Sequence, residues 1–451
     1  MPSRYPPGPT GILALKYALE FFRRPTEVLT RLTREYGDVV HLRLGPQHVF
    51  VLNRPEFVKE VLITNSNVFA KGKMMEGARR VLGDGLLTSR GDRHVRQRRA
   101  TAPAFHREQI EAYTATMVEC ADRTVSAWRD RDTVDVHAEM MRLTLAIVGR
   151  TLFSAELEKD TALQDGLNTL VRMSPLALVP FVESLEKLPI PSMRRINRAL
   201  RQLDSAVERL IADHRGEPHH DMLTMLMRTY GETVSDRELR DECVAMIFAG
   251  YETTSNALAW TWYLLSQHPE VDAALHSELS DVLGGHLPTV TDLPRLTYTE
   301  MLLSESIRLY PPAWAIGRRA TQPASIAGYQ VPAGSLLIVS QWLLHHDERY
   351  FPEASRFDPL RWTGEAQKSR PQFAYFPFGA GTRQCIGEGF AWTEALLLIA
   401  TIAPRWRLRL VPGHPVEPQA VVTLRPKHGM KMIVEGRVPA RAPTEGQLAR
   451  P

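Results

Sequence analysis

Cysteine is scarce in this sequence, with only Cys120, Cys243 and Cys385 among 451 residues. Three cysteines cannot form a disulfide framework, and such sparse use is typical of a reducing compartment, so we expect a cytoplasmic protein. Long apolar runs are also missing: no stretch is long enough to cross a bilayer, and the N-terminus lacks a signal-peptide pattern. We therefore expect no transmembrane anchor.

Charge of a single sign is lacking as well. The chain has 55 basic and 51 acidic residues, a net charge of +4, which argues against a nucleic-acid-binding protein. The sequence contains neither a Gly-rich dinucleotide fingerprint after a strand nor a cluster of cysteines. It therefore shows no site for a nicotinamide, a flavin or an iron–sulfur cluster.

The pattern of apolar residues predicts a mainly helical, α+β protein. Residues 11–36 have helical spacing, and strands are predicted at 39–44, 49–52, 336–339 and 421–424, on either side of a long helical middle. The tail from 436 to 451 is rich in Pro, Arg and Ala, and we expect it to be flexible.

Cys385 ends a Gly-rich loop just before an apolar helical run, where free backbone N–H groups can stabilise a thiolate. A lone thiolate of this kind suits a soft or borderline metal. Gly381 and Gly387 would let the backbone approach a flat ring, Phe378 could cover the sulfur, and Arg383 could pair with a carboxylate. The alternative is a buried structural thiol, the commoner state of a free cysteine.

Residues 378–387 fill every fixed position of the pattern F-x-x-G-x-R-x-C-x-G. This resembles the haem-binding loop of the cytochrome P450 superfamily, and the chain is similar to the bacterial type without an anchor. The resemblance implies the cytochrome P450 fold as one domain over residues 1–435, with Cys385 as the axial ligand of the haem iron. Since no C-x-x-C-H occurs, we expect haem b, iron protoporphyrin IX, bound non-covalently.

Ser235 and Glu238 form a predicted capping box at the start of a helix of about thirty residues that ends before Pro269. Its centre contains Gly250, Glu252 and Thr253, an unusual set inside an apolar helix. Gly250 could simply allow another helix to pack closely, with Glu252 reaching solvent. The segment resembles the family's A-G-x-D/E-T motif, which implies that Gly250 leaves room for O2, Thr253 hydrogen-bonds to it, and Glu252 supplies protons through water.

Glu305 and Arg308 are spaced to share a helix face, which by itself predicts only a surface ion pair. The apolar residues around them and the following Pro311-Pro312 instead resemble the family's E-x-x-R motif. The resemblance implies a scaffold under the thiolate loop, with Arg356 as its third member.

Haem carries two propionates, which need basic partners. The resemblance implies Arg98, Arg318 and Arg383, with His94 as a fourth. We interpret Arg93, Arg96 and Arg99 as a solvated basic face, which could steer an acidic electron donor.

The family geometry also implies an apolar substrate pocket, although each of its residues alone is more often ordinary core. It is expected to draw on residues 74–87, 173–190, 313–317 and the central helix; a contact of 173–190 with a membrane surface stays open. The candidate residues are Met74, Leu86, Ala245, Met246, Phe248, Ala249, Ala313, Trp314, Ile316, Val421 and Val422.

These features together predict a monomeric haem-thiolate monooxygenase. It would hydroxylate or epoxidise a lipophilic small molecule, with electrons from NAD(P)H through a separate ferredoxin or flavodoxin and its reductase. A peroxygenase or isomerase of the same fold ranks second, since such enzymes tend to lose the acid–alcohol pair that Glu252 and Thr253 form here. A non-catalytic haem sensor is a third reading.

Overall fold

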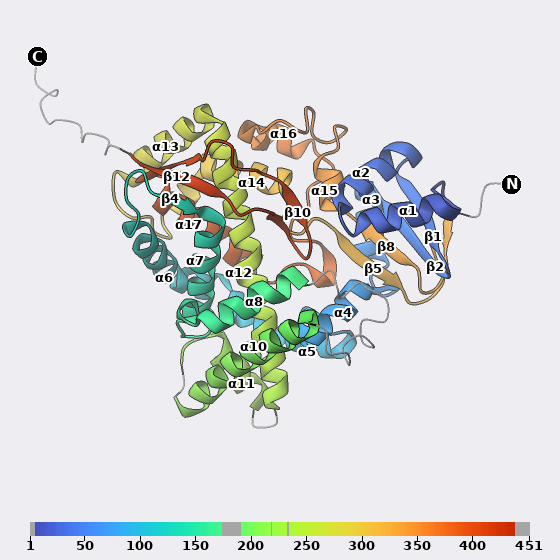
Figure 1. The fold of residues 1–451 in the computed structure, drawn as a ribbon, viewed down its shortest axis with the longest axis horizontal. Helices are drawn as coiled ribbons and strands as arrows, with labels where there is room; N and C mark the ends of the chain where they lie inside the picture. Colours follow the sequence, from blue (N-terminus) through green and yellow to red (C-terminus); the bar gives the residue numbers. More distant parts are fainter. Residues whose placement is uncertain (1–4, 174–190, 218, 232–233, 438–451) are drawn as a thin grey trace, which may run out of the picture.

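The computed structural model describes residues 5–173, 191–217, 219–231 and 234–437 (Figure 1). The tail 438–451 and most of the segment 173–190 therefore lie outside the described residues. The helices are α1 (Gly11–Phe21), α2 (Pro25–Tyr36), α3 (Pro55–Lys59), α4 (Lys73–Leu82), α5 (Gly91–Thr101), α6 (Arg107–Ser126), α7 (Val136–Leu152), α8 (Thr161–Met173), α10 (Pro191–Gly216), α11 (Met222–Tyr230), α12 (Asp236–Gln267), α13 (Pro269–Leu283), α14 (Thr297–Leu309), α15 (Gln341–His345), α16 (Gly364–Lys368) and α17 (Glu388–Ile402).

Within the described ranges the strands are short and form four small sheets, so the predicted mainly helical α+β class is confirmed. The largest sheet has the order β1-β2-β8-β5-β3, and β4, β12 and β9 form a second one. Two hairpins, β6-β7 and β10-β11, complete the set. The strands are β1 (Val39–Leu44), β2 (Gln47–Leu52), β3 (Phe69–Lys71), β4 (Thr133–Asp135), β5 (Ile316–Ala320), β6 (Ala324–Ile326), β7 (Tyr329–Val331), β8 (Leu336–Val339), β9 (Trp406–Leu410), β10 (Pro418–Ala420), β11 (Leu424–Pro426) and β12 (Lys431–Gly436).

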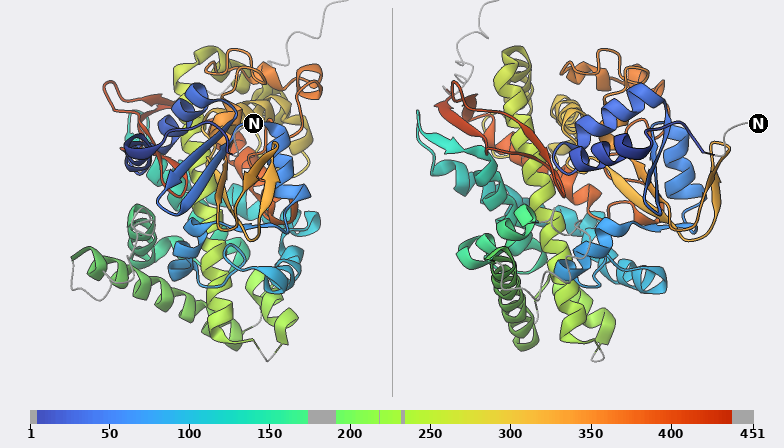
Figure 2. Two further views of the ribbon diagram at one scale, coloured as in Figure 1. Left: turned by 90° about the vertical axis from the view of Figure 1, so that its right-hand side faces the viewer. Right: turned by 45° about the vertical axis from the view of Figure 1, so that its right-hand side comes forward.

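Helix α12 runs through the centre of the molecule, and α7, α10, α14 and α17 pack around it (Figures 1 and 2). The predicted capping box is present: Glu238 N donates to Ser235 Oγ at 3.2 Å, and Ser235 N donates to Glu238 Oε2 at 3.4 Å. Since the middle of α12 is buried on nearly all sides, it is a core helix rather than a surface one.

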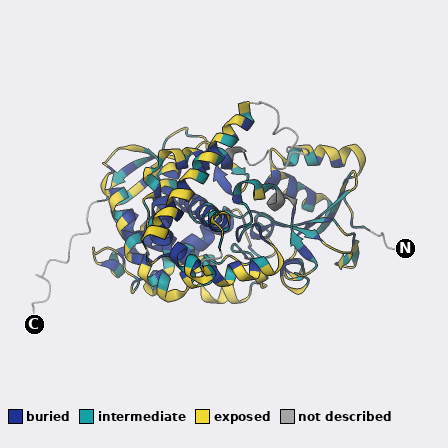
Figure 3. Ribbon diagram, turned by 90° about the horizontal axis from the view of Figure 1, so that it is seen from below, coloured by how far each residue is buried: buried dark blue, intermediate teal, exposed yellow. Residues whose placement is uncertain are grey.

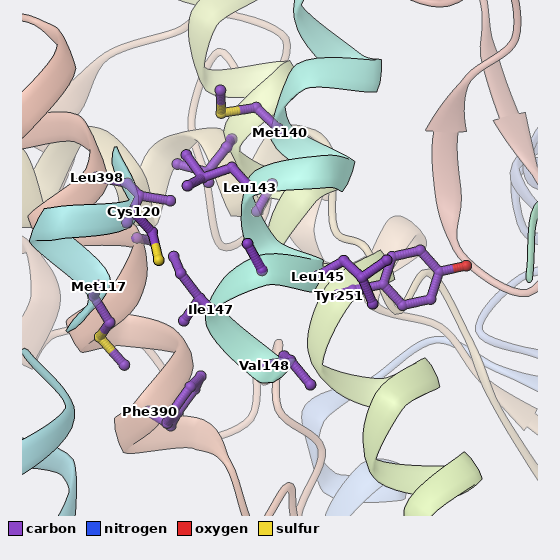
Figure 4. Close-up of a cluster of buried hydrophobic side chains, with 14 of the residues drawn as sticks. Met117, Cys120, Met140, Leu143, Leu145, Ile147, Val148, Tyr251, Phe390 and Leu398 are labelled. Carbon is purple, nitrogen blue, oxygen red and sulfur yellow. The ribbon is translucent and has the colours of Figure 1, made fainter. Parts of the chain in front are cut away.

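One large apolar cluster fills the space between α6, α7, α12 and α17 (Figure 4). Buried residues line the inner faces of the helices, and exposed residues lie on their outer faces (Figure 3). None of the helices in the described ranges is long and apolar enough to cross a membrane.

Two local predictions need correction. The predicted helical region 11–36 is split into α1 and α2, because Pro25 starts a new helix and its ring cannot continue the old one. The predicted strand over 421–424 is mostly a turn: β10 ends at Ala420 and β11 begins at Leu424, so Val421, Val422 and Thr423 connect the two strands of a hairpin.

Candidate functional site

The Cys385 loop joins a short turn to the N-terminus of α17. Gly379 and Gly381 have positive φ angles of 73° and 70°, which favour glycine. A Cβ on Gly381 would stand 2.2 Å from the Leu62 carbonyl oxygen, so the loop needs this glycine to pack against its neighbouring segment. Cys385 N donates to Phe378 O at 2.9 Å, which closes the loop.

The Cys385 side chain has accessible surface, whereas Cys120 and Cys243 are buried. Burial by the surrounding protein raises the pKa of its thiol to about 11. The Gly387 N–H acts in the opposite direction but is the weaker effect. The sulfur therefore faces a recess inside the protein and not the outer surface. The predicted help from the helix N-terminus is outweighed by burial, so a thiolate here needs a metal to balance its charge.

A single cysteine cannot hold a bare metal ion. Within the described ranges, no group of three or more His, Cys, Asp or Glu side chains could do so. A metal at Cys385 must therefore bring other ligands with it, as iron does in a porphyrin.

Burial and neighbouring positive charges lower the pKa values of four basic side chains near this recess. Burial and then Arg383 lower the pKa of Arg318 to about 10, and burial, Arg90 and Arg98 do the same to Arg383. The pKa of His94 falls to about 4 through burial, Arg383, Lys71 and Arg98. Arg383 Nη1 is buried and has no hydrogen-bond partner among the described residues.

Lys71 belongs to the same group, and the sequence analysis missed it. Burial and the charges of Arg383, Arg318 and Arg90 lower its pKa to about 7. Its ammonium donates to the carbonyl oxygen of Leu87, and it is the last residue of β3, paired with Arg318 on β5. Nothing in the local sequence marks this lysine, because the sheet alone brings it beside Arg318.

Buried positive charges without counterions are unfavourable, so this group fits an anionic ligand. The two propionates of haem supply such charges, and the Cys385 recess supplies the metal ligand. The expected residues Arg318, Arg383 and His94 thus lie together with Lys71. Arg98 donates from Nη1 to Gln384 O at 2.8 Å, which places it against the thiolate loop.

The middle of α12 is buried except at four positions, of which Ala249, Gly250 and Thr253 share one side of the helix. From Asp241 to Trp262, the residues with accessible surface are Phe248, Ala249, Gly250 and Thr253. Thr253 Oγ1 donates to Ala249 O at 2.7 Å, so its remaining lone pairs are free for another donor. Thr253 therefore has the accessible hydroxyl that the resemblance requires for a hydrogen bond to O2.

Gly250 has a packing role in the structure. A Cβ at this position would stand 2.6 Å from Val148 Cγ2 on α7 (Val148 is labelled in Figure 4). The missing side chain therefore lets α7 approach α12. This is the close packing of a second helix that the sequence analysis gave as the alternative role of Gly250. The expected room for O2 stays a prediction.

Glu252 is buried on a different side of the helix from Thr253, because successive residues are about 100° apart. Its Oε1 accepts a hydrogen bond of 2.8 Å from Thr423 Oγ1 and one of 3.4 Å from Asn256 Nδ2. Asn256 Oδ1 lies 2.9 Å from His137 Nε2. The sequence did not reveal Thr423, Asn256 or His137 as partners of this acid, because they come from separate segments.

The scaffold pair Glu305 and Arg308 is fully buried and bidentate, with distances of 2.7 and 2.8 Å. The prediction that Arg356 is the third member of this scaffold was wrong. It is exposed and lies 3.7 Å from the equally exposed Glu353, and only its backbone carbonyl contacts Arg308. Arg361 takes that place, with its Nε 3.2 Å from Glu305 Oε1, because the chain turns after Arg356 and returns to α14 at residues 359–362.

The candidate substrate residues fall into two groups. Phe248, Ala249, Ala313, Ile316, Val421 and Val422 have accessible surface, and Val422 is 48% exposed. Leu86, Ala245, Met246 and Trp314 are buried, and the side chain of Met74 lies outside the described residues.

Trp314 is buried, and its predicted contact with the substrate stays a prediction. It packs with Phe21 at a ring distance of 6.2 Å and donates to Val421 O, so it belongs to the core beneath α1.

Two acids at the start of α12 hold the segment 83–87. Asp241 Oδ2 accepts from Asp84 N at 2.7 Å, and Glu242 Oε2 accepts from Leu86 N at 3.1 Å. Gly83 and Gly85 are required here, since a Cβ on either would stand within 2.3 Å of Asp241 atoms. Burial raises the pKa of Glu242 to about 7.

Comparison with known proteins agrees with this geometry. A family model described as "Cytochrome P450" matches residues 6–433. "Cyclooctatin synthase" of Streptomyces melanosporofaciens is 37% identical over 96% of both chains. "Cyclooctat-9-en-7-ol 5-monooxygenase" of the same organism is 39% identical over 90% of both, and "Pentalenene oxygenase" of Streptomyces avermitilis is 34% identical over 96% of this chain and 98% of its own.

Proposed function

Because this chain belongs to the cytochrome P450 family and is a haem-thiolate monooxygenase, we propose that it hydroxylates or epoxidises a lipophilic, terpenoid-like small molecule. The proposal includes a single domain over residues 1–435 that acts as a cytoplasmic monomer. The observation that carries it is the accessible side of α12 formed by Ala249, Gly250 and Thr253, within an otherwise buried stretch of that helix.

The substrate class is supported by two facts. The pocket candidates with accessible surface are all apolar, so they favour a ligand that binds through burial, at about 25 cal/mol per Å2 of apolar surface. Three similar proteins carry names that refer to cyclooctatin, to cyclooctat-9-en-7-ol and to pentalenene. A bulky cyclic hydrocarbon or its alcohol is the substrate that we infer.

In the proposed mechanism, Cys385 would hold the haem through its iron, and Lys71, His94, Arg318 and Arg383 would hold its propionates. Bound haem supplies the iron at which O2 is activated for the transfer of one oxygen atom to the substrate. Phe248 and Ala249 exclude water from the reacting face of α12 and orient the substrate by contact.

Thr253 and Glu252 handle the protons. The Thr253 hydroxyl donates to Ala249 O and keeps lone pairs that can accept a hydrogen bond, so it can pass on a proton only after its own O–H turns away from Ala249 O. Glu252 is held by Thr423 and Asn256 on another side of the helix. It can act as the proton source only after its side chain rotates away from Thr423 or through a bridging water.

We infer that the electrons come from NAD(P)H through a ferredoxin or flavodoxin and its reductase. Arg98 ties α5 to the thiolate loop, and the exposed Arg96 and Arg99 lie on the same helix. Positive charge at this place would attract an acidic carrier toward the side of Cys385.

The decisive experiment is a binding screen on the haem-loaded enzyme. Cyclic terpenoid hydrocarbons and alcohols should shift the iron spin state. The best ligand should then be oxidised when NAD(P)H, a surrogate ferredoxin and its reductase are added. Turnover with peroxide alone, equal to that with the reductase system, would favour a peroxygenase. Binding of many such compounds without any oxidation would contradict the proposal.

The metal ligand is tested separately. Cys385→Ser should lose the thiolate-type spectrum of the reduced carbon monoxide complex, whereas Cys120→Ser should keep it. A retained spectrum in Cys385→Ser would refute the assignment of the ligand.

A further inference from the structure

Helix α1 exposes an unusual row of large apolar side chains. Ile12 is 88% exposed, Leu15 56%, Leu19 61% and the adjoining Phe22 47%. Phe22 keeps helical backbone angles, so these positions continue one helix. With 3.6 residues per turn, positions 12, 15, 19 and 22 lie on the same side, and we call them the outer stripe.

The opposite side of α1 is already packed. Ala14 and Tyr17 are buried, and the Tyr17 hydroxyl donates to Glu35 Oε2 at 2.7 Å. Phe21 packs against Trp314. The outer stripe is therefore not the side of α1 that packs on the core. The helix is apolar on two sides, and only one of them is covered by the part of the chain that the structure describes.

The outer stripe is also a concentration of exposed apolar surface. Ten large apolar residues in the described ranges are exposed, and five of them lie in α1 or directly after it. These five are the four residues of the stripe and Leu13, which is 45% exposed. Single exposed apolar residues are ordinary, but a contiguous row marks a contact surface.

The surrounding charges indicate what kind of surface covers the stripe. Lys16 is exposed and by helical spacing borders the stripe on one side, and the exposed Arg23 follows directly after Phe22 at the end of the stripe. The acid within α1, Glu20, forms an ion pair with Arg31, and Glu27 pairs with Arg24 at 3.3 Å. Helix α1 thus presents exposed apolar side chains next to exposed positive charges.

From this arrangement we propose that the outer stripe of α1 binds the surface of an anionic lipid bilayer, without crossing it. The apolar side chains enter the interface between headgroups and acyl chains, and Lys16 and Arg23 remain at the level of the anionic headgroups. Figure 1 shows α1 beside β1 and β2, at the end of the molecule that carries the N-terminus. The inference is independent of the proposed substrate, although a bilayer would hold a lipophilic substrate close to the enzyme.

The test is co-sedimentation of the haem-loaded, full-length protein with lipid vesicles. Vesicles made of equal parts phosphatidylglycerol and phosphatidylcholine should bind the protein at low salt, and vesicles of phosphatidylcholine alone should bind it more weakly. Leu15→Gln/Leu19→Gln should reduce the partition coefficient by about tenfold or more. Lys16→Gln/Arg23→Gln should remove most of the preference for anionic lipid.

The matched control is Leu287→Gln/Leu360→Gln, which changes two exposed leucines outside α1, 38% and 59% exposed. It should bind vesicles as the unchanged protein does. Equal melting temperatures and haem spectra would show that all variants are folded. No binding of the unchanged protein to anionic vesicles would overturn the proposal, and so would full binding by Leu15→Gln/Leu19→Gln. A dimer in solution that this variant converts to a monomer, without vesicle binding, would assign the stripe to a second copy instead.

Discussion

Thr423 donates a hydrogen bond of 2.8 Å from its hydroxyl to Glu252 Oε1, although 171 positions separate the two residues in the chain. The bond joins the turn between β10 and β11 to the middle of α12. It fixes the orientation of the only carboxylate in the motif at residues 249–254, so Thr423 is a positioning residue for the acid. Asn256 supports both partners, with its Nδ2 3.1 Å from Thr423 Oγ1.

Replacing Thr423 by Val removes this donor while keeping the shape of the side chain. We expect the amount of product per NAD(P)H to fall about two- to tenfold, because Glu252 loses its fixed orientation, with a stability loss of about 1 kcal/mol. Peroxide release against product measures the coupling. Thr401→Val is the control, since Thr401 is buried in α17 and donates only to Leu397 O. Unchanged coupling in Thr423→Val would show that Glu252 needs no positioning by this residue.

Thr253→Ala should uncouple electron consumption from product and release peroxide, with a loss of coupling of about tenfold or more. The reason is that Thr253 carries the accessible hydroxyl in the otherwise buried middle of α12, on the same side of the helix as Gly250. Thr261→Ala removes the same kind of hydroxyl-to-carbonyl bond, at 2.8 Å, from the buried part of the same helix, together with a bond of 2.8 Å to Ser306 Oγ on α14. If both variants lose coupling equally, the effect is one of helix stability and not of proton handling.

Arg361→Met should lower the free energy of unfolding by about 1–3 kcal/mol, because the buried Glu305 loses one of its charged partners. Arg356→Met should change it by less than about 0.5 kcal/mol, since both Arg356 and Glu353 are exposed. Urea unfolding of the two variants measures the difference. The reverse order would restore Arg356 as the third member of the scaffold.

Lys71→Met should weaken haem retention about tenfold or more, because a charged hydrogen bond to a propionate contributes about 1.5–3 kcal/mol. The rate of haem transfer to an acceptor apoprotein is the measurement. Lys59→Met, an exposed lysine on α3, is the control. Equal transfer rates for both variants would remove Lys71 from the propionate site.

Glu242 predicts a pH dependence of stability. Burial raises its pKa from 4.5 to about 7, so between these values the folded protein keeps a proton that the unfolded chain has released. The free energy of unfolding therefore falls as the pH rises through this window, by about 3 kcal/mol. The contribution is fully present below pH 4.5 and lost above about 7.

Glu242→Gln keeps an acceptor for Leu86 N but cannot ionise. Its free energy of unfolding should therefore fall less between about pH 5 and about pH 8, close to the two ends of the window, than that of the unchanged protein. Glu208→Gln, at an exposed position of α10, should follow the unchanged protein. Denaturant unfolding at both pH values compares them. Parallel pH profiles for all three proteins would contradict the assigned titration.

Local patterns in the sequence determined much of this protein. Ser235 and Glu238 marked the start of the central helix, and its apolar content predicted its burial, because capping and hydrophobic spacing depend on residues a few positions apart. The loop around Cys385 could be recognised for the same reason: its glycines and its cysteine are consecutive in the chain. The pairing of Glu305 with Arg308 needed only one helical turn.

Partners from distant segments were decided by the tertiary structure alone. Lys71 joins Arg318 because β3 pairs with β5, and Thr423 meets Glu252 because a hairpin folds over α12. Arg361 replaces Arg356 because a turn between them redirects the chain toward Glu305. A hydrogen bond or an ion pair requires an approach of about 3 Å, and such an approach depends on how whole elements pack, which no local pattern contains.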